Sequence, residues 1–209
     1  MTRTRRTVTL YTDYKSPYAY LAKDPAYALA RDFGVRLDVR PYVLTIPDFL
    51  GSARLDAAGN IVEEQRTAHQ WRRVKYSYMD CRRQAQKRGL TIRGTTKIWD
   101  TVLASAGMLY AQRQGDAVFR AYHDRVFERF WKRDLDIEDI AVVTAVLGEA
   151  GADTAGFAAY AGGEGAGEVD RISRAAEAAG VFGVPTFAID GELFWGREHL
   201  PDIRERLAA

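Results

Sequence analysis

The chain lacks the residues that disulfide and redox chemistry require, because its 209 residues include a single cysteine, Cys81. One cysteine excludes an intramolecular disulfide, a Cys-x-x-Cys redox pair and a thiolate-cage zinc site. Long apolar runs are also missing, since no stretch approaches the roughly 20 apolar residues of a membrane-spanning helix. The basic N-terminus is not followed by the hydrophobic core of a secretory signal. These absences predict a reduced, cytoplasmic protein without a membrane partner.

Charge of one sign is not in excess, because 30 Lys and Arg residues face 28 Asp and Glu, for a net charge of +2. Nucleic acids are bound by strongly basic surfaces. We therefore expect no nucleic-acid partner and interpret Arg82, Arg83, Lys87 and Arg88 as a solvated helix face. The three histidines lie too far apart in the sequence for a metal site. The composition is that of one globular domain that binds a small molecule or a partner.

The N-terminal residues predict a strand, a helix and a second strand. Residues 7–11 are β-branched and aromatic, and residues 35–43 alternate between apolar and charged side chains. Between them, Ser16-Pro17 is typical of a helix start and Gly34 of a helix end. A second cap-plus-proline pair, Asp24-Pro25, predicts an interruption of this helix. The order is that of a βαβ unit in a parallel sheet.

Sheet patterns return only near the C-terminus. Residues 169–179 are helical in pattern, and residues 186–189 read as a strand. Asp190-Gly191 is a strong hairpin turn, which predicts a return strand over residues 192–195. A closing helix is expected from Glu198 to Leu207.

Helical periodicity dominates the middle of the chain, including a long basic amphipathic stretch from Glu63 to Gly89. A turn at Gly59-Asn60 is compatible with a short hairpin. We therefore expect an α/β fold in which residues 1–46 and 168–209 form one domain. Residues 47–167 are expected to form an all-helical domain inserted into it.

Ser16 lies where a strand feeds a helix N-terminus, a place where amide N–H groups and the helix dipole favour an anion. The alternative is that Ser16 only caps the helix. The second motif is the loop Gly183-Val184-Pro185-Thr186, directly before a predicted strand.

Three motifs together resemble a known family. They are Asp13-x-x-Ser16-Pro17-Tyr18-x-Tyr20-Leu21, the run from Gly180 to Phe187, and Phe194-Trp195-Gly196. The chain is similar to the 2-hydroxychromene-2-carboxylate isomerases and the kappa-class glutathione transferases. Both belong to the DsbA-like branch of the thioredoxin fold. The resemblance covers most of the chain and implies a thioredoxin-like fold with the helical domain between its βαβ and ββα halves.

This resemblance implies a site for glutathione or another low-molecular-weight thiol. Ser16 takes the place of the nucleophilic cysteine of thioredoxin-fold oxidoreductases, and is expected to donate a hydrogen bond to the thiol sulfur. Pro185 is expected to follow a cis peptide bond, with the main chain of Val184 pairing with the tripeptide. Arg73 is expected to meet a glutathione carboxylate, and Arg197 and Glu198 the γ-glutamyl end. The resemblance also implies a homodimer.

Two functions remain open from the sequence. The first is a glutathione-dependent isomerase or transferase in which a thiolate adds to a conjugated aromatic or enone acid and is then eliminated. The second is a redox-inactive DsbA-like binding protein without catalysis. Large aromatic side chains are expected in the core or at the domain interface, one or two of them in an acceptor pocket: Trp71, Tyr78, Trp99, Tyr110 and Trp131.

Overall fold

The computed structural model describes residues 6–209, so the start of the basic N-terminus lies outside the described range. The strands are β1 (Thr7–Thr12), β2 (Arg36–Pro41), β3 (Ala53–Leu55), β4 (Ile61–Glu64), β5 (Thr186–Ile189) and β6 (Glu192–Trp195). The helices are α1 (Pro17–Phe33), α2 (Ile46–Leu50), α3 (Ala68–Gln86), α4 (Val102–Gln112), α5 (Asp116–Lys132), α6 (Ile140–Glu149), α7 (Phe157–Tyr160), α8 (Ala166–Ala178) and α9 (Leu200–Ala208). A π-helical turn, η1 (Ala161–Gly165), precedes α8, and a 3-10 turn, η2 (Arg197–His199), precedes α9.

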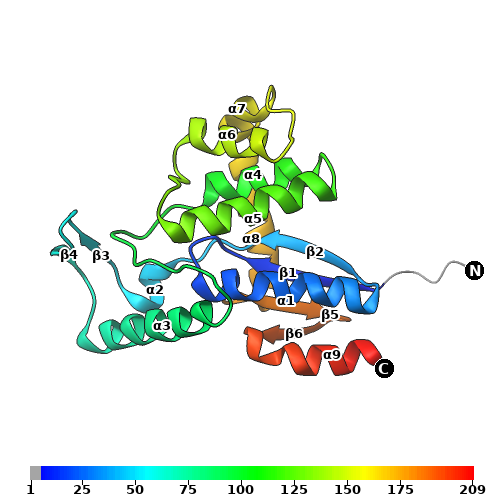
Figure 1. Ribbon diagram of the computed structural model, residues 1–209, viewed down its shortest axis with the longest axis horizontal. Helices are drawn as coiled ribbons and strands as arrows, with labels where there is room; N and C mark the ends of the chain where they lie inside the picture. Colours follow the sequence, from blue (N-terminus) through cyan, green and yellow to red (C-terminus); the bar gives the residue numbers. More distant parts are fainter. Residues whose placement is uncertain (1–5) are drawn as a thin grey trace, which may run out of the picture.

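One sheet joins the two ends of the chain, with its four strands in the order β2-β1-β5-β6. β1 and β2 are parallel, whereas β5 pairs antiparallel with both β1 and β6. Helices α4 to α7 lie on one side of this sheet in Figure 1, and α9 lies on the other. The expected α/β class is confirmed, and the long excursion between β2 and β5 is mostly helical. No helix within residues 6–209 is long and apolar enough to cross a membrane.

Helix α1 begins where the sequence predicts. Ser16 has extended backbone angles and caps the first turn, Pro17 occupies the first helical position, and Gly34 ends the helix at φ +63°. The predicted interruption at Asp24-Pro25 is wrong, because α1 runs without a break through Pro25.

A distant arginine explains why α1 tolerates this proline. Proline has no N–H, so Pro25 leaves the carbonyl of Leu21 without its helical donor. Arg88 supplies one, since its Nη1 donates to the Leu21 carbonyl at 2.5 Å while its Nη2 pairs with Asp24 at 3.1 Å. Arg88 is exposed, as expected from the sequence, but it also has this structural contact, which the sequence did not indicate.

The intervening segment is not entirely helical, as β3 and β4 form an antiparallel hairpin around Gly59-Asn60. Glu63 and Glu64 lie in β4, so the helix predicted from Glu63 begins only at Ala68. Thr67 starts it with a capping box: the Gln70 amide donates to Thr67 Oγ1, and Gln70 Oε1 accepts from the Thr67 amide. In Figure 1 the hairpin and α3 extend to the left of the sheet.

The aromatic face of α5 forms much of the core. Tyr122, Phe127 and Trp131 are each at most 1% exposed. Phe127 stacks on Tyr20 of α1 with ring centroids 5.4 Å apart, and also packs against Tyr14. Burying one such ring contributes about 2–3 kcal/mol. This packing fixes the start of α1 against α5.

Candidate functional site

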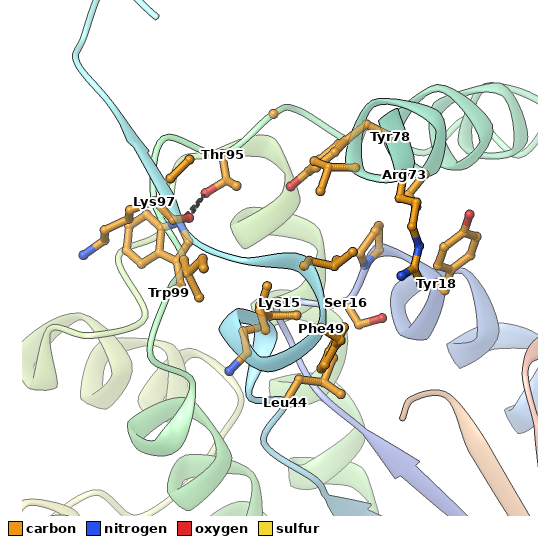
Figure 2. Close-up of a pocket in the computed structure, with 18 of the residues that line it drawn as sticks. Lys15, Ser16, Tyr18, Leu44, Phe49, Arg73, Tyr78, Thr95, Lys97 and Trp99 are labelled. Carbon is orange, nitrogen blue, oxygen red and sulfur yellow. Dashed lines mark hydrogen bonds between the residues drawn. The ribbon is translucent and has the colours of Figure 1, made fainter. Parts of the chain in front are cut away.

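A cavity of about 700 Å³ opens beside the N-terminus of α1, and Figure 2 shows part of its lining. Its walls come from the β1–α1 loop, the α2–β3 region, α3, the 94–99 loop, the end of α5, the loop before β5, and β6. The volume falls within the range of about 300–1,000 Å³ that small-molecule sites occupy. Segments far apart in the sequence therefore meet around one space.

Ser16 lines this cavity although its residue is only 5% exposed. Its Oγ accepts a hydrogen bond from the Ala19 amide at 3.2 Å, which is the capping bond of α1. A hydroxyl has one donor and two acceptor lone pairs, so capping leaves the O–H available. The cap and the binding role considered from the sequence are therefore compatible in one side chain.

The loop before β5 meets the same cavity. The register pairs Tyr11 with Thr186, so the end of β1 lies beside the Val184–Pro185 bond, which is cis. Val184 lines the cavity, and its N–H and C=O form no hydrogen bond with the part of the chain that the structure describes. Pro185 is outside the lining, and its carbonyl accepts from the Gly196 amide at 2.8 Å.

Arg73 also lines the cavity, and in Figure 2 its side chain extends from α3 toward Ser16 and Tyr18. The other two predicted binding residues, Arg197 and Glu198, lie outside the lining. They follow Trp195, which does line it, and the Glu198 carboxylate folds back over Gly196, where a Cβ would collide with it.

Buried contacts fix the loop that carries Ser16. The Asp13 carboxylate accepts from the Leu44 amide at 2.8 Å and from the Lys15 amide at 3.2 Å. Lys15 Nζ lies 3.3 Å from Asp13 Oδ2 and 3.3 Å from Thr101 Oγ1, which ties the loop to α4. The sequence analysis did not single out Lys15, although it directly precedes Ser16 and lines the cavity.

Behind the same loop, the Tyr14 hydroxyl and His123 Nδ1 are 3.0 Å apart and buried. Burial lowers the pKa of His123 well below its ordinary value, and the charges of Lys23 and Arg120 act in the same direction. Burial raises the pKa of Tyr14. Both groups are therefore neutral, so the Tyr14–His123 contact adds no charge behind the loop.

The cavity side of the loop is strongly cationic by comparison. Seven lining side chains carry positive charge: Lys15, Arg66, Arg73, Lys75, Arg82, Lys97 and Arg133. No Asp or Glu within residues 6–209 lines the cavity. In a chain whose net charge is only +2, this is a local concentration of positive charge. The arrangement favours an anionic ligand.

Aromatic rings make up most of the remaining wall. All four tryptophans of the chain line the cavity: Trp71, Trp99, Trp131 and Trp195. Tyr78 lines it as well, whereas Tyr110 packs against Phe157 and Tyr160 elsewhere. The cavity is therefore lined by more aromatic side chains than the one or two expected from the sequence.

Two further observations bear on the chemistry that the cavity can support. Cys81 is fully buried, and burial raises the pKa of its thiol to about 12, so this thiol stays protonated near neutral pH. Among residues 6–209, no three His, Cys, Asp or Glu side chains gather where they could hold a metal ion. The described side chains therefore supply a hydroxyl, cations and aromatic faces.

Comparison with known proteins shows the family and the fold to which the chain is similar. The family model described as DSBA-like thioredoxin domain matches residues 7–208. A 2-hydroxychromene-2-carboxylate isomerase of Pseudomonas putida is 30% identical over 200 residues, covering 92% of this chain and 90% of that protein. The corresponding isomerase of Sphingobium xenophagum is 29% identical over 198 residues, covering 93% and 94%. A solved structure of a 2-hydroxychromene-2-carboxylate isomerase matches with a TM-score of 0.72 and 25% identity, covering 97% of this chain and 94% of that one.

Proposed function

This chain belongs to the DSBA-like thioredoxin domain family, and from that premise we propose that it is a glutathione-dependent isomerase. The relatives with which it shares about 30% of residues are named as isomerases of 2-hydroxychromene-2-carboxylate. Its substrate is a conjugated aromatic acid of that type. The observation that carries the proposal is that Ser16 and Val184 line one aromatic cavity in which no Asp or Glu of residues 6–209 takes part.

The residues around Ser16 fit a thiol-bearing tripeptide. The Ser16 O–H is available to a sulfur, and the α1 N-terminus adds a positive dipole that favours a thiolate. The main chain of Val184 has an unused donor and an unused acceptor, which match a peptide backbone. Arg73 supplies a cation for a carboxylate, since it forms no ion pair with another described residue.

When bound, glutathione supplies a thiolate that can add reversibly to an electron-poor double bond and so permit rotation about it. The chain's own residues hold the reactants in position. Ser16 orients the sulfur by its hydroxyl, which unlike a thiol cannot form a disulfide. The aromatic walls exclude water from the conjugated acid, and the surrounding cations stabilise the negative charge that develops on its oxygens.

Calorimetric titration with reduced glutathione tests this proposal together with an absorbance assay of 2-hydroxychromene-2-carboxylate isomerisation. We expect saturable binding and a rate that requires added glutathione. S-methylglutathione is the control ligand, because it keeps the tripeptide but has no free thiol, and it should bind without supporting turnover. Absence of both binding and turnover would support the redox-inactive binding protein instead.

A further inference from the structure

Three arginines of the cavity lie near Tyr78, and Arg82 lies over its ring with Cζ 5.5 Å from the centroid. The positive charges of Arg133, Arg82 and Arg66 all act on this phenol. Arg133 Nε donates to the Gly94 carbonyl at 2.8 Å, and Arg82 Nη2 packs against the same glycine, where a Cβ would come within 3.2 Å of it. Two guanidinium groups therefore meet at Gly94. In Figure 2 the Tyr78 hydroxyl points from α3 toward the 94–99 loop.

In the described part of the chain, no acidic side chain lies within ion-pair distance of these arginines, although the charge of Glu64 acts on Arg66. Lys15 and Lys97 pair with Asp13 and Glu138, but Arg66, Arg82 and Arg133 form no ion pair with any residue between 6 and 209. Like charges that are partly shielded from water repel one another more strongly than charges in bulk water. A bound anion relieves this repulsion, because it places negative charge between the guanidinium groups.

Backbone carbonyls hold the three guanidinium groups in place, and Arg66 Nε donates to those of Leu50 and Gly51 at 3.0 and 3.3 Å. Arg133 donates to the carbonyls of Arg93, Gly94 and Phe130, at 3.2, 2.8 and 3.1 Å. Arg82 Nε donates to the Ile92 carbonyl at 3.1 Å, which leaves its two Nη groups without a described acceptor. The cations are therefore ordered before a ligand arrives, which lowers the entropy cost of binding.

The neighbouring wall is aromatic and contains an unpaired donor. Arg133 lies over the rings of Phe130 and Trp131, at 4.4 and 4.8 Å from their centroids. Trp131 lines the cavity, and its Nε1 is buried with no hydrogen-bond partner among the described atoms. Leaving such a donor unpaired costs about 1–3 kcal/mol. The Arg133 guanidinium is therefore packed on an aromatic wall of the cavity.

We propose that Tyr78, Arg82 and Arg133 form a carboxylate-binding subsite for an aromatic acid, with Arg66 adding charge and the tryptophan walls enclosing the ring. The inference rests on the proposed function in one respect: the acid bound here is taken to be the substrate to which the thiolate adds. A planar carboxylate accepts two parallel hydrogen bonds from a guanidinium, which an ammonium cannot offer. The subsite would therefore set which acids the cavity accepts, separately from the thiol beside Ser16.

Titration with trans-cinnamate in the absence of any thiol tests the subsite directly. Tryptophan fluorescence reports the binding, since every tryptophan lines the cavity. We expect saturable quenching by cinnamate and much weaker quenching by neutral cinnamamide. Arg82→Met should weaken cinnamate binding about tenfold or more, as expected for lost hydrogen bonds to a charge.

Arg83→Met is the matched control, because Arg83 lies on the same helix, is exposed and is absent from the lining. It should leave the cinnamate affinity unchanged. Tyr78→Phe removes only one hydroxyl and decides the case if Arg82→Met does not fold, with an expected loss of about fivefold. Equal affinity for cinnamate and cinnamamide, or no effect of either substitution in folded protein, overturns the subsite.

A parallel titration with reduced glutathione separates this inference from the proposed function. If cinnamate binds as expected and glutathione does not, the subsite stands and the glutathione site fails. If glutathione binds and cinnamate does not, the subsite fails alone. Arg82→Met should leave the glutathione affinity unchanged.

Discussion

The two ends of the cavity are made in different ways. Beside Ser16 the wall consists of one hydroxyl, the main chain of Val184 and the helix N-terminus, which the sheet register and α1 bring together. Around Tyr78 the wall consists of arginine side chains held by loop carbonyls. The first end depends on the fold, and the second on particular side chains. We infer that the thiol chemistry resides in the first and the choice of acid in the second.

Removing the Ser16 hydroxyl is the most severe test of that division. Ser16→Ala should lower kcat about a hundredfold, because the donor to the sulfur is lost. It should also lower the free energy of unfolding by about 1 kcal/mol, since the α1 cap is lost. Isomerase kinetics and urea denaturation measure the two effects.

The Ser16→Asp substitution separates the effect on kcat from the effect on stability. Aspartate is a good N-cap, so the stability should stay close to that of the parent protein. Its negative charge opposes a thiolate, so the activity should be at least as low as in Ser16→Ala. An alanine variant with more than half of the parental kcat would remove Ser16 from the chemistry.

A smaller effect is expected at the glutathione contacts. Arg73→Met should weaken glutathione binding about tenfold, because a carboxylate loses its cationic partner. Val184→Ala should change the affinity less than about twofold, because the proposed contact uses only the main chain. Calorimetry on both variants measures the difference. Equal losses would mean that glutathione is not held by the side chain of Arg73 and the main chain of Val184 in the two different ways proposed.

The smallest expected effect is on stability, and it comes from the buried His123 behind the Ser16 loop. Burial holds the pKa of His123 below its ordinary value of about 6.5, so the unfolded chain binds more protons as the pH falls below that value. The stability that the neutral histidine contributes is present at neutral pH and is lost on acidification. One such group changes the free energy of unfolding by at most about 1.4 kcal/mol per pH unit.

Urea denaturation of the parent protein and of His123→Phe between about pH 7 and pH 5 checks this contribution. The variant should be less stable at neutral pH by about 1–3 kcal/mol, because the buried Tyr14 hydroxyl loses its partner. Its stability should fall less steeply with acid than that of the parent. Parallel slopes would show that His123 is not a neutral buried group.

Local signals predicted the sheet and the bounds of α1 well, whereas Pro185, Arg197 and Glu198 of the predicted site lie outside the cavity lining. The strands at residues 186–189 and 192–195 lie where the sequence pattern and the Asp190-Gly191 turn predicted them. Ser16-Pro17 and Gly34 bound α1 as expected. Each of these features depends on residues that are neighbours in the sequence.

Features that depend on distant partners were missed. Pro25 does not break α1, because Arg88, in the turn after α3, replaces the missing donor. Arg82 was interpreted as solvated, yet it lines the cavity. It lies there beside Arg133, the residue that caps the C-terminus of α5. A signal was present on α3, where Trp71, Tyr78 and Arg82 recur at helical spacing on one face. Nothing local shows that this face meets the 94–99 loop.

The burial of Cys81 has a practical consequence for following this cavity in solution. It is the chain's single cysteine, and its thiol is shielded and held protonated by a pKa of about 12. A cysteine introduced at Phe182, a cavity-lining side chain that is 64% exposed, would therefore be modified selectively. A fluorine or spin label attached there would report ligand binding and motion at the exposed part of the cavity. The native cysteine could be left in place.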